Sequence, residues 1–438
     1  MVTSVVGKIF LEAYNEKHNK AYTPKSFFVE VYYPIFFANE KYLIWIQNSA
    51  IVQNLKKEEI PQENNEKTRQ EKIVEIKKNK LIDKIESAEF FDASIAVGYR
   101  AERSDATTSG QTCIHNYRMK TEEAYLSWIG AGLGVGIKGG LTILFSKPDI
   151  LLDIAEGWEW YRKYLDTTLG MKGNQINTWN GQWLKRKYDI NDSSSLLDFD
   201  SAFSNKEKKG EKKSSLVEIE TLSWIELITA VSLYFPDPRM MGYVYNIGQT
   251  NTTIGFIPFV LSSTREVNYL YKKHFGTEDE EKAMKLFGTA FGFSMACKEG
   301  VIGLKALEPK GLSSIMMGRE IPSYKQEEKL KYETYQIWLL AMLNNEELWN
   351  RANEFARALD SFRKGQGKDR TNRDNAIEEL LAHPSKQSVV RNVYPILKDA
   401  EEEERETIMD VIKIIHDMPA ENVPYFIALT KIHHVILR

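Results

Sequence analysis

The chain has 438 residues, which is enough for two or three domains with at least one large hydrophobic core. Its content of 42% hydrophobic and 27% charged residues is that of a globular protein, and its net charge of −3 excludes a globally basic nucleic-acid binder while allowing local basic patches. The two cysteines, Cys113 and Cys297, exclude a disulfide framework and a cysteine-rich zinc site, so we expect a reducing, cytoplasmic compartment.

The N-terminal 51 residues are predicted to contain β-strands. Residues 1–10 lack the pattern of a signal peptide, and no later apolar run reaches the roughly 20 residues needed to span a bilayer, so we expect no membrane partner. Residues 5–11 fit either a strand or a first helical turn. Residues 27–33 and 42–46 are rich in Val, Ile, Phe and Tyr, and residues 39–41 between them are typical of a turn, which predicts a β-hairpin.

Two polar segments, near residues 56–70 and 191–215, are predicted to be mobile insertions. The first is followed by Ile73, Ile76, Leu81 and Ile85 near helical spacing, which predicts a surface helix. The second contains a serine run and five lysines. A basic loop could contact a phosphate backbone, although a plain solvated loop has the same composition.

A polar segment with arginines on both sides follows residues 91–99, which have the composition of a strand. Arg100, Arg103 and Arg118 surround the small polar run 107–112. Small residues with free backbone donors beside arginines could hold a phosphate or a nucleic-acid backbone. An ordinary polar loop with scattered charges is the alternative.

Glycine recurs between residues 130 and 140, at Gly130, Gly132, Gly134, Gly136, Gly139 and Gly140. Alternate glycines remove side chains from one face of an extended segment, which suits a backbone that another group approaches closely. The segment contains a formal G-x-G-x-x-G, but the following residues 141–145 look extended, whereas a dinucleotide site requires a helix there. A phosphate-dependent enzyme site at 130–140 is kept as an alternative.

The next segment predicts a helix followed by a polar loop. Residues 146–149 form a capping-box pattern, Gly170 is a C-terminal stop, and an apolar stripe lies between them at Ile150, Ile154, Trp158, Tyr161 and Leu165. Residues 173–183 combine amide side chains with two tryptophans. Amides can read base edges, and indole rings can stack on bases or hold the loop against the core.

The remaining sequence predicts mostly helices. Residues 218–235 read as a helix that ends at Pro236, residues 246–261 as a strand pair, and residues 266–275 and 279–296 as helices. Six further helical segments predict an all-α bundle, at 332–343, 346–362, 373–382, 385–397, 403–416 and 423–437. The fold class is therefore α+β, with a mixed α/β body over residues 1–322 followed by an all-α bundle over 323–438.

No catalytic constellation is found in the sequence. The seven histidines form no pair at metal-ligand spacing, and no nucleophile elbow is present, so we expect neither a metal nor another cofactor. This favours a binding protein that is not an enzyme. A protein-binding scaffold with an aromatic interface is a further alternative.

The overall plan resembles the large subunit of type I CRISPR surveillance (Cascade) complexes. The resemblance is carried by the glycine-rich segment, the 172–183 loop, the C-terminal helices and the ending at 418–426. It implies a non-catalytic subunit that holds the 5′ end of a guide RNA, inspects the protospacer-adjacent motif in double-stranded target DNA, contacts other Cascade subunits and recruits a helicase-nuclease. Some members have zinc-binding cysteine pairs that this chain lacks. Some also make a small subunit from an internal start, for which Met316, Met317 or Met342 could serve.

The residues predicted to contact nucleic acid are chosen by their chemistry. Basic side chains would neutralise phosphates, most notably in the loop at 363–373, and amides would inspect base edges. The set comprises Arg100, Arg103, Arg118, Lys138, Lys172, Asn174, Gln175, Asn177, Asn180, Gln182, Arg186, Arg363, Lys364, Lys368 and Arg370.

Overall fold

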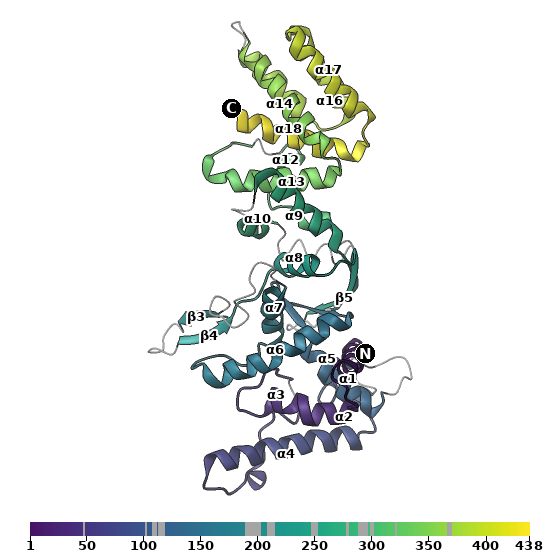
Figure 1. Cartoon of the computed structure of the whole chain (residues 1–438), viewed down its shortest axis with the longest axis vertical. Helices are drawn as coiled ribbons and strands as arrows, with labels where there is room; N and C mark the ends of the chain where they lie inside the picture. Colours follow the sequence, from purple (N-terminus) through teal and green to yellow (C-terminus); the bar gives the residue numbers. More distant parts are fainter. Residues whose placement is uncertain are drawn as a thin grey trace. The chain divides into compact units, whose positions relative to one another are not determined.

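The computed structural model describes residues 1–46, 49–100, 103–106, 112, 119–188, 203–207, 215–246, 253–276, 280–287, 297, 302–319, 322–365 and 370–438. Helices dominate it, together with a four-stranded sheet and a two-stranded hairpin, which confirms the α+β class (Figure 1). The chain forms two compact units. Unit 1 comprises Met1–Ser223, Leu233–Phe235 and Met240–Phe259, and unit 2 comprises Trp224–Ser232, Pro236–Arg239 and Val260–Arg438. The boundary expected after residue 322 falls inside unit 2.

Unit 1 begins with helices, so the predicted β-hairpin is wrong. Helix α1 (Val2–His18) is followed by α2 (Pro24–Phe27), the π-helix η1 (Phe28–Tyr32) and α3 (Tyr33–Phe37). Thr23 and Ser26 form a capping box that starts α2. The rings of Phe28, Tyr32 and Phe36 lie four residues apart and stack in sequence, with ring centroids 5.5 and 3.9 Å apart. A helix buried on all sides has no polar face, so its composition resembles that of a buried strand.

The next part of unit 1 contains one long surface helix and a run of turns. Helix α4 (Glu66–Ser87) confirms the predicted surface helix, and the short η2 (Lys57–Glu59) precedes it. The strand predicted at 91–99 is wrong, because these residues form turns. Asp92 Oδ1 accepts hydrogen bonds from the backbone and the hydroxyl of Ser94, a local bond that competes with strand pairing. The short η3 (Ser104–Ala106) follows.

Two glycines allow the first helix of unit 1 to cross α5 (Thr121–Gly132) closely. A Cβ added to Gly7 would fall well inside 3.0 Å of the Leu126 carbonyl oxygen, and one added to Gly130 would fall equally close to that of Thr3. The helices α1 and α5 therefore pack backbone to backbone at this crossing.

The sheet of unit 1 has the strand order β1-β2-β5-β6. Its strands are β1 (Val135–Ile137), β2 (Leu141–Phe145), β5 (Arg239–Asn246) and β6 (Thr253–Val260). β1 pairs with β2 around the turn at Lys138–Gly140, and β2 pairs antiparallel with β5, where Ile143 lies opposite Val244. The extended conformation predicted for 141–145 is confirmed. Of the strand pair expected at 246–261, β6 lies within that range, and its partner β5 lies before it.

Two further helices and a hairpin complete unit 1. Helix α6 (Pro148–Thr167) buries the predicted apolar stripe, but its N-cap is Lys147 and no side chain caps it. Helix α7 (Ile176–Lys187) follows. The segment predicted as a mobile insertion at 191–215 includes β3 (Phe203–Glu207), which pairs antiparallel with β4 (Ser215–Ile219). The other residues of 191–215 lie outside the described residues.

Unit 2 is helical, and its six C-terminal helices confirm the predicted bundle. Helix α18 (Val423–Leu437) is buried along most of its length and packs on α13 and α14. The described elements of unit 2 are α8 (Trp224–Tyr234, shared with unit 1), α9 (Leu261–Phe275), α10 (Glu280–Leu286), η5 (Leu304–Leu307), α12 (Leu312–Met316), η6 (Gln326–Glu328), α13 (Lys329–Leu343), α14 (Glu347–Lys364), α15 (Arg370–Ala382), α16 (Lys386–Asp399), α17 (Glu402–Asp417), η7 (Ala420–Asn422) and α18.

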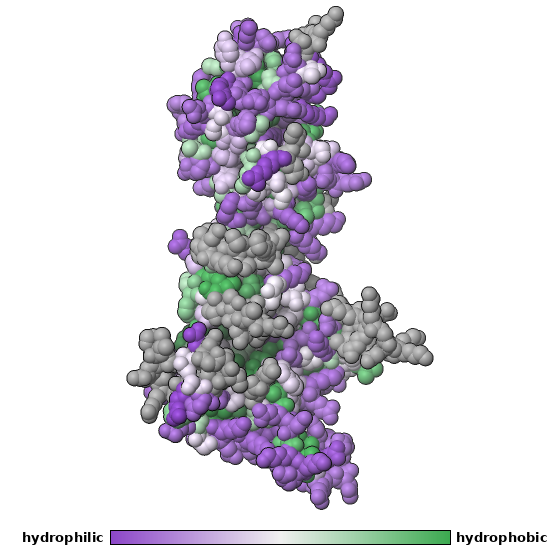
Figure 2. Space-filling view, turned by 180° about the vertical axis from the view of Figure 1, so that it is seen from behind, coloured by the Kyte–Doolittle hydropathy of each residue, from purple (hydrophilic) through white to green (hydrophobic). Residues whose placement is uncertain are grey.

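One face of the described residues is mainly polar (Figure 2). Figure 2 shows one face of the molecule, on which hydrophilic residues predominate and hydrophobic residues form smaller areas between them. Among the helices that the structure describes, none is both long and apolar enough to cross a membrane.

Candidate nucleic-acid interface

The loop conformation predicted for residues 173–183 is wrong, because most of this segment is helix. Residues 176–183 form the first two turns of α7, whose N-cap is Gln175. One face of α7 packs on α6 and another on β1. The amides and indoles that suggested a loop therefore lie on helix faces that point into the core of unit 1.

The amide side chains of this segment are mostly used inside the protein. Asn180 is fully buried, and its Nδ2 donates hydrogen bonds of 2.8 Å to the carbonyls of Gly132 and Gly134. Gln182 Nε2 donates to the Glu220 carbonyl, and Gln175 Oε1 accepts from the Ile219 amide. The Oδ1 atom of Asn177 is buried without a hydrogen-bond partner among the described residues. The amides of Gln175, Asn180 and Gln182 therefore fix α7 within unit 1.

Trp179 and Trp183 hold α7 against α6. The indole of Trp179 donates to the Gly157 carbonyl, and that of Trp183 donates to the Asp153 carbonyl, each at 2.7 Å. The Tyr161 ring stacks on Trp179, with centroids 5.3 Å apart. Both indole rings are buried, so of the two roles considered for them the structure supports packing against the core.

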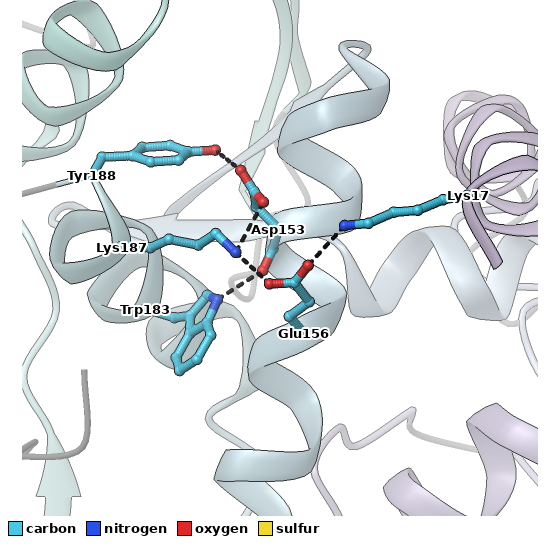
Figure 3. A network of polar contacts seen from close by, with 6 residues as sticks. All are labelled: Lys17, Asp153, Glu156, Trp183, Lys187 and Tyr188. Atoms are coloured by element: carbon cyan, nitrogen blue, oxygen red, sulfur yellow. Dashed lines mark hydrogen bonds and ion pairs between the residues drawn. The ribbon is translucent and has the colours of Figure 1, made fainter. Parts of the chain in front are cut away.

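A polar network fixes the last turn of α7 (Figure 3). Lys187 lies between Asp153 and Glu156 of α6, and Glu156 also pairs with Lys17 of α1 at 2.9 Å. Burial opposes ionisation of Glu156, but hydrogen bonds from Lys187 and Lys17 hold its pKa below the ordinary value. Tyr188 donates a hydrogen bond to Asp153, and burial together with the Asp153 charge raises the pKa of Tyr188. The network ties three helices together. Arg186 beside it is half-buried.

The glycine-rich segment is approached closely by the protein itself. A Cβ on Gly132 would meet the Phe36 ring at 2.8 Å, one on Gly134 would meet the Thr142 methyl at 2.7 Å, and one on Gly136 would meet the backbone of Asn177 at 3.1 Å. Gly139 and Gly140 have positive φ in the β1–β2 turn, which their lack of Cβ permits. Nothing in this packing favours the phosphate-dependent enzyme site considered from the sequence.

The backbones of Lys138 and Lys172 both pair with residues 217–222, a segment that begins in β4. The Lys172 amide donates to the Val217 carbonyl, and the Lys138 amide donates to the Leu222 carbonyl. The Lys172 side chain pairs with Glu218 at 3.0 Å, an exposed contact of the kind that contributes little stability. Lys138 is exposed at the β1–β2 turn, and no ion pair to it occurs within the described part of the chain. Both lysines are accessible to a phosphate.

The predicted arginine cluster is only partly described. Arg100 is exposed. Arg103 makes two hydrogen bonds of 3.1 Å to Asp105 and lies over the Phe90 ring. Arg118 and the polar run at 107–112, except Thr112, lie outside the described residues, so their grouping with Arg100 stays a prediction.

The basic loop at 363–373 has fewer available cations than its sequence indicates. Arg363 is buried and binds Asp360 of the same helix at 2.8 and 3.0 Å, and Lys364 binds the other Asp360 oxygen at 2.6 Å. Burial raises the pKa of Asp360, but hydrogen bonds from Lys364 and Arg363 outweigh it and lower the pKa. Arg373 donates to the Phe362 carbonyl. Lys368 lies outside the described residues, and Arg370 is exposed at the start of α15.

The structure also brings together a surface group that sequence reasoning missed, which we call the aromatic–basic patch. It consists of Lys41, Tyr42, Trp45, Lys77 and Asn174 in unit 1. The Trp45 side chain is 51% exposed, and its ring stacks on Tyr42 with centroids 6.1 Å apart and planes 29° apart. Lys77 Nζ lies 3.3 Å from the Tyr42 hydroxyl, and Lys41, which precedes Tyr42 in the chain, is exposed.

Hydrogen bonds from two neighbouring segments hold this patch in place. Arg162 of α6 donates to the carbonyls of Ile35 and Lys41, each at 2.8 Å, and fixes the chain after α3. The Asn174 amide donates to the Tyr42 carbonyl at 2.7 Å, and Asn174 has the left-handed φ of 60° that asparagine tolerates. Asn174 is exposed, and it is the predicted amide that this arrangement leaves at the surface.

The electrostatics of the patch favour an anionic or aromatic ligand. Burial lowers the pKa of Lys77 and raises that of Tyr42, the latter also because of the Glu40 charge. The Lys77 ammonium group is thus partly desolvated against the Tyr42 ring, at 5.8 Å from its centroid. The sequence contained a signal for this site, because Tyr42 and Trp45 are three residues apart and Lys41 precedes them. It was missed because residues 42–46 were predicted to form a strand.

Comparisons with known proteins gave no match to a protein-family model, to a curated protein or to a solved structure.

Proposed function

We propose that the chain is a non-catalytic nucleic-acid-binding subunit of an RNA-guided DNA surveillance complex of the CRISPR type. Its proposed partners are a guide RNA, double-stranded target DNA, other Cascade subunits and a helicase-nuclease. The observation that carries the binding part of this proposal is the aromatic–basic patch. The resemblance of the sequence to Cascade large subunits supplies the identity of the complex.

The patch has the chemistry of a single-strand binding surface. Proteins hold unpaired nucleic acid by stacking bases on aromatic rings and by placing cations near the phosphates. Trp45 offers a half-exposed indole face already oriented by Tyr42. Lys41 and Lys77 supply the cations, and Asn174 offers an amide that could contact a base edge.

Replacement of the Trp45 ring tests the proposal directly. We expect Trp45→Ala to weaken binding of a short single-stranded RNA by roughly 5- to 150-fold, because one base–aromatic stack contributes about 1–3 kcal/mol. Trp45→Phe, which keeps a ring, should recover part of the loss. Fluorescence anisotropy with a labelled oligonucleotide at fixed salt measures both.

A matched control uses another exposed aromatic residue of the same unit. Phe256 is 67% exposed and lies on β6, so Phe256→Ala removes a comparable ring without touching the patch. Oligonucleotide binding should be unchanged in this variant. If both variants bind as the parent does, or if both lose binding equally, the patch is not the nucleic-acid site.

The membership in a CRISPR complex has its own test. RNA that copurifies with the tagged chain from its native host should be enriched in repeat-derived guide RNA, and this enrichment should persist through a second purification step. Bulk cellular RNA without such enrichment would leave nucleic-acid binding in place but would contradict the proposed complex.

A further inference from the structure

Unit 1 contains an apolar pocket that the proposed nucleic-acid site does not use. The pocket has a volume of about 460 Å³ and lies between α1 and the strands β2, β5 and β6. Its walls are aliphatic, methionine and aromatic side chains, with Ser146 as the single small polar residue. The lining includes Val5, Ile9, Ser146, Met241, Tyr243 and Phe256.

Three lining side chains from different elements are unusually exposed for apolar residues. The exposed fractions are 67% for Phe256 of β6, 56% for Val5 of α1 and 46% for Met241 of β5. The Phe256 ring contacts Tyr243, with centroids 5.1 Å apart. Scattered exposed apolar residues are ordinary, but residues that converge on one pocket are typical of a binding surface.

The lining side chains favour an apolar ligand over an ionic one. No lining side chain is charged. Methionine and aliphatic walls adapt to apolar side chains of varied shape, as they do in surfaces that bind helices. A phosphate or a metal ion would find no charged side chain in this lining.

The shape of the site restricts the secondary structure of the segment that could bind there. An added β-strand is disfavoured, because the outer strand β6 contains Pro258, which lacks an N–H, and Gly255, whose φ of 112° departs from strand geometry. A whole helix is about 10–12 Å across and could not enter the pocket, but it could lie over it and insert side chains from one face. Apolar residues at i and i+4 of a helix lie on one face and suit such an insertion.

Two lysines stand next to the pocket lining in the sequence. Lys8 and Lys147 are the charged residues that directly adjoin a lining residue in the sequence, and no acidic residue does. Lys8 is exposed, and its contact with Glu12 is a loose one of 3.8 Å on the helix surface. Acidic residues on either side of an apolar anchor would complement this rim.

We infer that the pocket between α1 and β5–β6 docks an amphipathic helix of a partner protein, whose apolar residues at i and i+4 enter the pocket and whose flanking residues are acidic. The inference concerns a different surface from the aromatic–basic patch and does not depend on nucleic-acid binding.

The probe for this inference is a stapled helical peptide of about 14 residues, with two leucines four residues apart and glutamates around them. Saturable binding to the whole chain is expected by isothermal calorimetry. Phe256→Ala and Val5→Asp should each weaken it by at least about tenfold, as for a central interface residue. Both positions are exposed, so the variants should keep the thermal unfolding midpoint of the parent.

Two control variants test whether the peptide recognises the charge beside the pocket and whether it binds at the pocket. Lys8→Glu should weaken the glutamate-flanked peptide and strengthen a lysine-flanked version, and Trp45→Ala should leave peptide binding unchanged. The inference is overturned if the peptide does not bind saturably or if the pocket variants bind it as the parent does. It is also overturned if Phe256→Ala abolishes oligonucleotide binding instead, which would make the pocket a site for an unpaired base. Absence of oligonucleotide binding with intact peptide binding would contradict only the proposed nucleic-acid function.

Discussion

At the scale of single residues, several side chains with nucleic-acid-binding chemistry are used to hold unit 1 together. The Asn180 amide joins α7 to the carbonyls of Gly132 and Gly134, while Asn174, six residues earlier, remains at the surface. The two asparagines have the same chemistry and differ only in where the fold places them. A sequence read alone has no means of separating them, because burial depends on contacts with residues more than 40 positions away.

The two asparagines should therefore behave differently when they are replaced. Asn180→Ala is expected to lower the free energy of unfolding by roughly 2–4 kcal/mol, because two buried carbonyls lose their donor. Asn174→Gly should be within about 0.5 kcal/mol of the parent, since glycine tolerates a φ of 60°. Urea denaturation monitored by circular dichroism compares them. Equal stabilities would mean that the Asn180 hydrogen bonds contribute little.

A buried histidine in unit 2 makes stability depend on pH. His433 is 8% exposed, Gln336 Nε2 lies 3.2 Å from its Nδ1, and burial, with the charges of His274 and Arg357, lowers its pKa to about 4. The unfolded chain binds the proton at about pH 6.5. The contribution to stability is therefore complete above pH 6.5 and is lost as the pH falls towards 4, by on the order of 3 kcal/mol.

Replacing this histidine should flatten the acid dependence. His433→Gln keeps a polar side chain near Gln336 but cannot take up a proton, so the decline of unfolding free energy between pH 6.5 and 4 should become shallower than in the parent. Thermal unfolding at several pH values gives the slope. An unchanged slope would assign the acid sensitivity to other groups, such as His274 and His434, whose pKa values burial also lowers.

At the scale of elements, the sequence predicts amphipathic helices well, whereas a short buried segment can hide its helical period. The helices α6, α14, α16 and α17 each have one polar face, so their period of 3.6 residues is visible. The segment at 27–37 is apolar on nearly all sides, and its period is hidden, so it read as a strand. α7 read as a loop because its asparagines, glycine and glutamine are poor helix formers whose contacts in the core compensate.

The glycines of α5 were predicted to permit a close approach, and the structure identifies the approaching group as α1. Gly130→Ala should destabilise the chain by several kcal/mol, although alanine favours a helix over glycine by about 1 kcal/mol, because the added methyl group would overlap the Thr3 carbonyl. Gly303→Ala, whose Cβ would have no neighbour closer than 3.8 Å, is the control. A stabilised Gly130→Ala variant would show that α1 and α5 can separate at little cost.

At the scale of the whole molecule, two different surfaces of unit 1 are proposed to bind two kinds of partner. The aromatic–basic patch would take unpaired nucleic acid, and the apolar pocket would take a helix of another protein. The predicted site residues fall into two groups. Lys172 and Asn174 are exposed, whereas Asn180, Gln182 and Arg363 are buried and structural. Composition and spacing identified the right kinds of side chain but not which of them reach the surface.

The measurement that tests the central claim most directly is photochemical crosslinking of the whole chain to a single-stranded RNA containing 4-thiouridine, followed by mass-spectrometric mapping of the crosslinked residues. We expect crosslinks concentrated at Trp45, Tyr42 and Lys77, which disappear when unlabelled RNA competes. Crosslinks confined to unit 2, or spread over the surface without competition, would contradict this claim.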